Sequence, residues 1–180
     1  MATQQPSQLR HPNRYLTTHD SDGNAIISHA IEPAVAINDF HGEFTASLLY
    51  TNARQPELTG DADIDAYKSY LASPPGITIS EGSVCRICDL PPSCLTAMHR
   101  TASLDYGVVV EGEVELVLDS GETRHLFRVQ RGTNHAWRNA TPAGGWARML
   151  YVLESSQPVK LAGGQALEAD FGGIDFTEKA

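Results

Sequence analysis

Short alternating segments separated by turn residues fill the second half of the chain, and this pattern constrains the fold most. The predicted strands are Ser83–Asp89, Leu95–His99, Leu104–Val110, Glu113–Leu118, Thr123–Gln130 and Trp146–Leu153. Turn-forming residues stand between them at Pro91-Pro92, Glu111-Gly112, Asp119–Gly121 and Pro142–Gly145. Strands of this length, with a turn about every ten residues, are typical of a β-sandwich or a closed β-barrel. The sequence therefore predicts an all-β fold.

The first 75 residues predict an extension in front of this β region. Strands are expected at Ala25–Ile31 and Phe44–Tyr50, and one short helix at 61–71. The helix has an apolar face and Asp61 or Asp63 as a candidate N-cap. The residues of that face are Ile64, Tyr67, Tyr70 and Leu71. We divide the chain into an N-terminal arm and extension at 1–75, a barrel at 76–165 and a C-terminal tail at 166–180, with residues 1–14 as a loose arm.

Two segments of the β region carry a histidine in strand-like surroundings. The first runs from His99 through Asp105 to Gly112, and the second from Gln130 through His135 to Asn139. Two imidazoles and one carboxylate can bind a transition metal and leave coordination positions open for chemistry. Taken singly, each histidine fits a structural role, whereas the cluster favours a site.

The spacing of these two segments resembles the two motifs of the cupin family. His99-x-Thr101-xxx-Asp105-xxxxxx-Gly112 is similar to the first motif, His-x-His, three or four residues, Glu, six residues, Gly. Gln130-x-Gly132-xx-His135-xxx-Asn139 is similar to the second, Pro-x-Gly-xx-His-xxx-Asn. The resemblance implies a single cupin β-barrel of the jelly-roll type that binds one divalent metal, and it implies a homodimer. Both segments most resemble single-domain cupins of fungi and bacteria, some of them encoded beside biosynthetic genes for polyketides or other secondary metabolites.

The chain departs from the cupin pattern at the expected metal site. Thr101 replaces the second histidine, and Asp105 replaces a longer glutamate. The resemblance therefore implies at most three ligands, His99, Asp105 and His135, for Fe, Mn, Zn or Ni. The segment Thr123–Gln130 contains no turn residue where the family has one, so a strand or turn is shortened there. A shift of one residue in register would turn His135 to the other face.

The remaining residues near the motifs predict a small-molecule pocket. Thr101 is expected to line it, and Trp137 shares the face of His135, as pocket wall or as barrel core. The expected apolar lining is Leu104, Val109, Trp137, Met149 and Val152. We expect a tailoring enzyme for an aromatic or polyketide-like metabolite, with oxidoreductase, decarboxylase, dehydratase and isomerase chemistry all open and His99, Asp105 and His135 as metal ligands or acid/base groups. The alternatives are a non-enzymatic ligand-binding cupin and a structural protein with a vestigial pocket.

The composition of the chain excludes some classes of binding partner and predicts its cellular location. The formal net charge is −9 and there is no run of Lys or Arg, so neither nucleic acid nor an anionic membrane is expected as a partner, and no nucleotide cofactor is expected. No apolar stretch is long enough to span a bilayer and the first residues lack a signal core, which predicts a cytoplasmic protein. Cys85 and Cys88 have a C-x-x-C spacing, but a strand places them on opposite faces, so structural thiols are expected for them and for Cys94.

Overall fold

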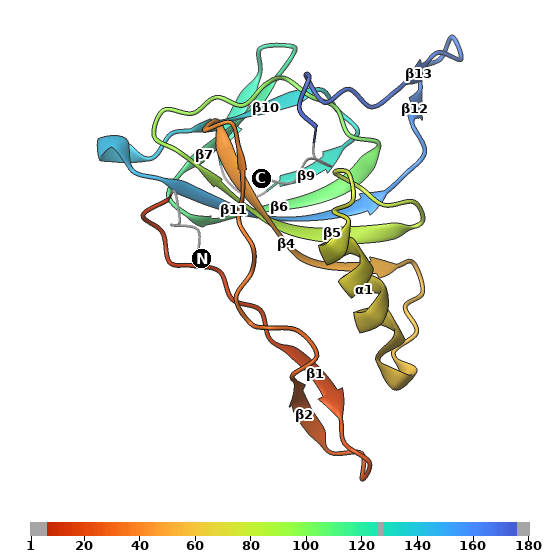
Figure 1. The fold of residues 1–180 in the computed structure, drawn as a ribbon. Coiled ribbons are helices and arrows are strands. Elements are labelled where there is room, and N and C mark those ends of the chain that lie inside the picture. Colours follow the sequence, from red (N-terminus) through yellow and green to blue (C-terminus); the bar gives the residue numbers. More distant parts are fainter. Residues whose placement is uncertain (1–6, 126–127, 176–180) are drawn as a thin grey trace.

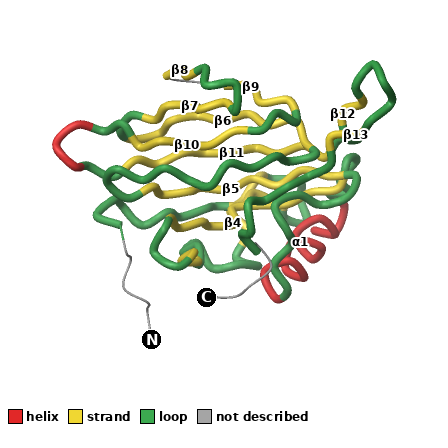
Figure 2. Tube along the Cα trace, turned by 90° about the horizontal axis from the view of Figure 1, so that it is seen from above, coloured by secondary structure: helices red, strands yellow, loops and turns green. Residues whose placement is uncertain are grey.

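Two facing antiparallel sheets form a barrel in the computed structural model, which describes residues 7–125 and 128–175 (Figures 1 and 2). The larger sheet has six strands in the order β3-β4-β5-β11-β6-β9, and the smaller has three in the order β10-β7-β8. The larger sheet contains β3 (Asn38–Phe40), β4 (Phe44–Ala53), β5 (Gly82–Leu90), β11 (Ala147–Ser155), β6 (Ser103–Glu111) and β9 (Arg128–Arg131). The smaller contains β10 (His135–Asn139), β7 (Val114–Leu118) and β8 (Thr123–His125). The predicted all-β barrel is confirmed.

Alternation along the strands builds the interior of the barrel. Met149 and Leu153 of β11 are buried, whereas the adjacent Glu154 is exposed, because successive side chains point to opposite faces. One apolar cluster lies between the two sheets, and a second lies near the helix. The first contains Phe40, Phe44, Ala46, Leu90, Val114, Trp137, Ala147 and Met149. The second contains Leu48, Tyr67, Ile77, Val84 and Leu153.

The helix α1 (Ala62–Ala72) follows a short 3-10 turn, η1 (Thr59–Asp61), and packs beside β4 (Figure 1). Its Tyr67 is fully buried and donates its hydroxyl to the carbonyl of Leu48 at 2.9 Å. Asp61 occupies the N-cap position but makes no side-chain cap bond, so the expected capping is wrong. The carboxylates of Asp61 and Asp63 instead accept hydrogen bonds from Thr18 and Tyr50, which join the helix to the preceding strands.

Two small hairpins lie outside the barrel sheets. β1 (Leu16–His19) pairs with β2 (Ala25–Ser28) in an arm that projects from the body (Figure 1). Near the other end of the chain, β12 (Val159–Lys160) pairs with β13 (Ala166–Leu167). Another 3-10 turn, η2 (Pro142–Gly144), joins β10 to β11. Within the described residues, no helix is long and apolar enough to cross a membrane.

Two of the expected strands differ in the structure. Residues 95–99 form isolated bridges to β10, at Leu95 and at His99, rather than a continuous strand. The expected strand over 123–130 is divided into β8, which pairs with β7, and β9, which pairs with β6. The chain changes sheets here, which a single straight strand cannot do. The expected absence of a turn in this segment falls partly on residues 126 and 127, which lie outside the described residues.

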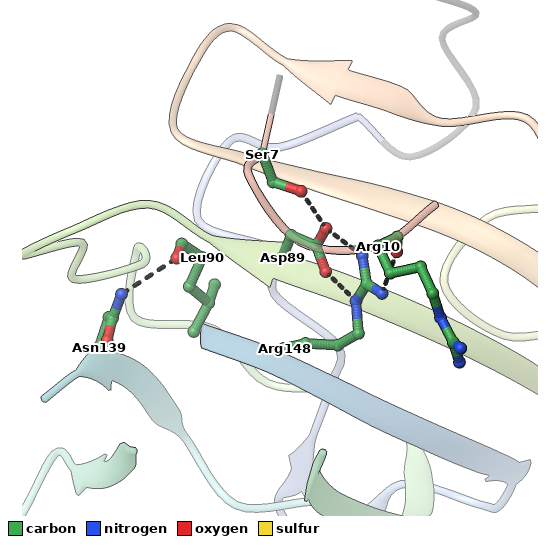
Figure 3. A network of polar contacts seen from close by, with 6 residues as sticks. All are labelled: Ser7, Arg10, Asp89, Leu90, Asn139 and Arg148. Carbon is green, nitrogen blue, oxygen red and sulfur yellow. Dashed lines mark hydrogen bonds and ion pairs between the residues drawn. The ribbon is translucent and has the colours of Figure 1, made fainter. Parts of the chain in front are cut away.

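A buried ion pair fixes the N-terminal segment to the outside of the larger sheet (Figure 3). The guanidinium of Arg148 binds the carboxylate of Asp89 through Nε and Nη2, both at 2.6 Å. Ser7 donates to the same carboxylate at 2.7 Å, and Arg148 Nη1 donates to the carbonyl of Arg10. Asn139, the last residue of the second motif, donates from Nδ2 to the carbonyl of Leu90 at 3.0 Å. These contacts hold β5, β10 and β11 in register around the barrel interior.

Candidate functional site

A small cavity of about 60 Å³ lies inside the barrel, and residues of both histidine motifs line it. It is lined by Phe44, Ile77, Arg86, Cys88, Leu90, Thr96, His99, Thr101, Asp105, His135, Trp137, Tyr151, Leu153 and Ile174. Apolar and aromatic side chains make up just over half of this lining, and the polar side chains include both histidines, Thr101 and Asp105. The residues that were expected to form the site, His99, Thr101, Asp105, His135 and Trp137, therefore face one common space.

Backbone pairing holds the two histidines together. His99 and His135 exchange backbone hydrogen bonds at 2.8 Å in both directions, and their rings lie 4.3 Å apart between centroids. Nδ1 of His99 lies 2.9 Å from the carbonyl of Ala97, and Nδ1 of His135 lies 3.0 Å from that of Thr133. A carbonyl oxygen can only accept a hydrogen bond, so Nδ1 of His99 carries the hydrogen and its Nε2 keeps the lone pair. Nδ1 of His135 also lies 3.3 Å from Nε2 of Gln130, but the shorter contact to the Thr133 carbonyl assigns the same tautomer to this ring. This is the tautomer in which a histidine binds a metal through Nε2.

Both histidines are neutral in this environment. Burial lowers the pKa of His135 to about 4, and the neighbouring His99 ring adds to this effect while the Thr133 carbonyl opposes it. Burial also lowers the pKa of His99, against the hydrogen bond to the Ala97 carbonyl. Neutral imidazole is the form that binds metal ions.

Asp105 enters the cavity from β6. It is 5% exposed, and its Oδ2 accepts a hydrogen bond from the Thr101 hydroxyl at 3.1 Å. Its Oδ1 is buried and has no hydrogen-bond partner among the described residues. Burial raises the pKa of Asp105 to about 6, against the nearby hydroxyls of Ser103 and Thr101, which lower it. A buried carboxylate oxygen without a donor is costly, and a cation or a proton at that position would satisfy it.

The donor set fits a divalent metal in its chemistry but is not assembled as a complete shell. Among the residues that the structure describes, no three His, Cys, Asp or Glu side chains are placed to bind one ion together. Two imidazoles with free Nε2 atoms converge, and Oδ1 of Asp105 shares their cavity. Two histidines and one carboxylate suit Fe, Mn or catalytic Zn. The roles of the three residues as ligands stay a prediction.

Trp137 and Thr101 both lie at the histidine pair. Trp137 is buried, meets the His135 ring edge-on at 5.3 Å and lies 5.7 Å from the Tyr151 ring. It belongs to the first apolar cluster as well as to the cavity wall, so the two interpretations of Trp137 both hold. Thr101 is 1% exposed and bonded to Asp105, so it orients the carboxylate.

The expected apolar lining is partly wrong. Val152 faces a concavity of about 770 Å³ on the outside of the sheet, because it alternates with the inward Tyr151 and Leu153. Leu104 likewise alternates with the inward Asp105 and is not part of the cavity wall. Val109 and Met149 pack in or against the first apolar cluster instead of lining the cavity.

The sequence did not identify much of the cavity wall, including Arg86, Cys88, Tyr151 and Ile174. Arg86 is 4% exposed, and its Nη2 donates to the carbonyls of Pro75 and Gly76 in the loop after α1. The alternation of β5 with Cys88 could have identified Arg86 as inward-facing. Nothing local in the sequence places Ile174 there.

The cysteines behave as expected. All three are free thiols, and Cys88 lines the cavity whereas Cys85 does not. Burial raises the pKa of Cys88 to about 12 and also raises that of Cys85. Thiols that stay protonated are poor nucleophiles, which fits a structural role.

The barrel and its paired-histidine cavity define a small β-barrel protein with a candidate site inside the barrel, and comparison with known proteins gives its family. Phomopsin biosynthesis cluster protein C′ of Diaporthe leptostromiformis is 44% identical over 161 residues, covering 87% of this chain and 85% of that protein. A cupin-domain-containing oxidoreductase of Hypocrea virens is 35% identical over 162 residues, covering 84% and 79%. The cupin domain of Schizosaccharomyces pombe Cnp3 superposes with a TM-score of 0.47 and 10% identity, covering 82% of this chain and 90% of that one. No protein-family model matches the chain.

The relatives that are named for a cupin domain match most of both chains, at 35% and 38% identity in two cases. The chain therefore belongs to the cupin family, as the spacing of its two motifs predicts. Its relatives include proteins of fungal biosynthesis clusters, among them protein J of the oryzines cluster of Aspergillus oryzae.

Proposed function

We propose that the chain is a cupin-type oxidoreductase that modifies a small secondary metabolite in the barrel cavity. The observation that carries the proposal is the His99–His135 pair. The centroids of the two rings lie 4.3 Å apart, and Asp105, whose Oδ1 has no donor among the described residues, lines the same cavity. Relatives named as cupin-domain-containing oxidoreductases, and others named for the phomopsin and oryzines biosynthesis clusters, support the reaction class and the metabolic setting.

His99, His135 and Asp105 would hold one divalent metal, with iron, manganese, zinc or nickel as candidates. Such a metal would polarise a substrate carbonyl or, in the case of iron, activate oxygen. The Nδ1 contacts to the carbonyls of Ala97 and Thr133 fix the orientation of both rings for this purpose.

The chain's own groups supply acid–base chemistry and exclude water. If no metal is bound, Asp105, with its pKa raised to about 6, would exchange a proton near neutral pH, and the Thr101 hydroxyl holds its carboxylate in place. Trp137 and Phe44 form aromatic walls that would stack on an aromatic or polyketide-like substrate. These walls also keep water from the reacting atoms, which strengthens every charge interaction inside the cavity.

Metal content tests the proposal directly. We expect protein purified without chelator to retain about one metal ion per chain, since a single set of ligands is proposed. His99→Gln and His135→Gln should lose the metal while circular dichroism shows the fold unchanged. His125→Gln is the matched control, because its side chain is 55% exposed on β8, away from the cavity. Equal metal in all four proteins, or none in the wild type, would contradict the proposal.

A non-enzymatic ligand-binding cupin is the second candidate. It is favoured by the lack, in the described part of the chain, of three metal-binding side chains around one point. Such a protein would gain thermal stability with its ligand by mass action but would not convert it. Product analysis after incubation with a cluster metabolite, the metal and oxygen separates the two functions, because only the enzyme forms product.

We also propose a homodimer, formed through the outer face of the larger sheet. Tyr106 of β6 pairs with Val129 of β9, and the two are 41% and 51% exposed. Exposed neighbouring apolar side chains on a sheet favour contact with another surface. Sedimentation should show a dimer that Tyr106→Glu dissociates, and a wild-type monomer at micromolar concentration would refute this.

A further inference from the structure

The described end of the chain closes the cavity. Residues 168–175, which we call the strap, follow β13 and return across the barrel opening (Figure 1). Asp170 exchanges two backbone hydrogen bonds with Arg100, at 2.6 and 2.9 Å. Ile174 lines the cavity and packs against the first apolar cluster, and Phe171 packs against the second. The strap therefore borders the site directly, and its bridge to the barrel lies one residue from His99.

The cavity is too small to admit a metabolite unless one of its walls moves. Pockets for metabolite-sized ligands occupy about 300–1,000 Å³, and a water molecule needs only about 10–15 Å³. The cavity of about 60 Å³ thus holds a few waters but no aromatic or polyketide-like molecule. Most of its other walls belong to strands with continuous hydrogen-bond ladders, such as β5, β6 and β11. Opening those strands would break the larger sheet, so the walls that can move lie outside the ladders, in the loop at Ile77, at residues 96–101 and in the strap.

A short bridge and two apolar side chains attach the described strap to the barrel. Within the described residues its one strand-like pairing is the bridge at Arg100, and most of its residues are exposed. Gly172 and Gly173 have φ angles of 60° and 87°, a region that glycine adopts without strain. A Cβ at Gly172 would lie 2.9 Å from the carbonyl oxygen of Met98, so the strap seats closely on the rim only because glycine stands there. A single strand-like pairing and mostly exposed residues are features of segments that open locally, whereas Ile174 and Phe171 supply the apolar contacts that seat the strap when it is closed.

We propose that the strap covers the entrance of the site. When the strap closes over a bound substrate, Ile174 forms part of the wall around it. Lifting the strap breaks the Arg100–Asp170 bridge and withdraws Ile174, which enlarges the cavity and uncovers His99 and His135. The strap then closes over the ligand and excludes water. This inference rests on the proposed function only in assuming a small-molecule ligand.

Chemical access to the two buried histidines tests the strap without any substrate or metal. Diethyl pyrocarbonate modifies neutral imidazole, and peptide mass spectrometry gives the rate at each histidine. Cysteines at a hydrogen-bonded antiparallel pair have Cα atoms about 5.5 Å apart, within the range for a disulfide. The double variant Arg100→Cys/Asp170→Cys should therefore lock the strap when oxidised and release it when reduced.

We expect the oxidised double variant to slow modification of His99 and His135 at least about tenfold, and dithiothreitol to restore the rate. Ile174→Ser should accelerate it severalfold, because the strap seats less firmly. Val159→Ser is the matched control on the same tail, since Val159 is 44% exposed and not part of the cavity wall. The rate at the exposed His125 should be the same in every protein.

Unchanged rates at His99 and His135 in both the locked variant and Ile174→Ser would overturn the strap as the entrance. If the disulfide does not form, which free-thiol analysis shows, Ile174→Ser alone decides the outcome. The result is independent of the metal, because the reagent reports access to the rings in chelator-treated protein. Failure of the metal proposal would instead appear as equal metal content in the histidine variants.

Discussion

Asp105→Asn should stabilise the metal-free protein at high pH and lose most of that effect in acid. Burial raises the pKa of this carboxyl to about 6 in the folded chain, whereas its ordinary value is 3.8. Well below pH 3.8 the carboxyl is protonated in both states and has no effect. As the pH rises from 3.8 to about 6, the unfolded state releases this proton while the folded state keeps it, so stability is lost, and the loss is complete once the folded state also carries the charge above about pH 6.

The size of the effect follows from the two pKa values. The difference between 3.8 and about 6 corresponds to about 3 kcal/mol of stability lost at pH 8 and about 0.5 kcal/mol at pH 4. The side chain introduced by Asp105→Asn is uncharged at both pH values, although its buried amide costs about 1–3 kcal/mol throughout. The cost of the amide cancels between the two pH values, so the gain at pH 8 should exceed that at pH 4 by about 2.5 kcal/mol.

Thermal unfolding of both proteins at pH 4 and pH 8, after treatment with chelator, measures this difference. For a chain of this length, about 2.5 kcal/mol corresponds to about 5–10 °C in Tm. Asp65→Asn is the control, because Asp65 is an exposed carboxylate on α1 that pairs with Lys68 at 2.8 Å. If Asp105→Asn changes Tm by the same amount at both pH values, the charge of buried Asp105 does not destabilise the folded protein, and the reasoning is refuted.

Three further substitutions test the packing and the electrostatics in and around the site. Asp89→Ala leaves the buried Arg148 without its counter-charge and should cost about 3–5 kcal/mol in urea unfolding; a loss under about 1 kcal/mol would show that the pair is not buried. Gly112→Ala places a Cβ 2.4 Å from Oγ1 of Thr141 at a φ of 74°, so folded yield and Tm should fall sharply, and an unchanged Tm would refute this geometry. The buried neutral His135 should lower the stability of metal-free protein as the pH falls from 6.5 to about 4, in the opposite direction to Asp105, so stability should fall less or rise more over this range in His135→Gln than in the wild type; equal slopes in both proteins would contradict this.

The barrel could be predicted because its strands alternate and its turns are marked in the sequence. β5, β6, β7 and β11 lie within a residue or two of the predicted segments, and α1 is one residue from its predicted limits. Residues 95–99 were harder to predict. Their alternation is that of a strand, yet only two positions pair with β10, which depends on the path of the chain after Pro91-Pro92. Pairing of this kind is decided by distant segments rather than by local pattern.

The cavity, like the fold, could be predicted only in part from the local sequence pattern. Motif spacing placed His99 and His135 together, and strand alternation placed Trp137 beside them. Arg86 could have been predicted from the alternation of β5, but its contacts with the loop after α1 could not. Ile174 comes from a segment that pairs with Arg100, so only the folded chain shows that it closes the cavity. The orientations of His99, His135 and Asp105 within the cavity depend on side-chain rotamers, which the sequence does not determine.

X-ray absorption spectroscopy of the metal-loaded protein tests the central claim most directly, because it identifies the ligands of the bound ion. The proposed site predicts two imidazole ligands with oxygen donors in the remaining positions, and His135→Gln should leave one imidazole or none. Sulfur in the shell would assign the ion to Cys88 instead, and a shell without imidazole would contradict the paired-histidine site.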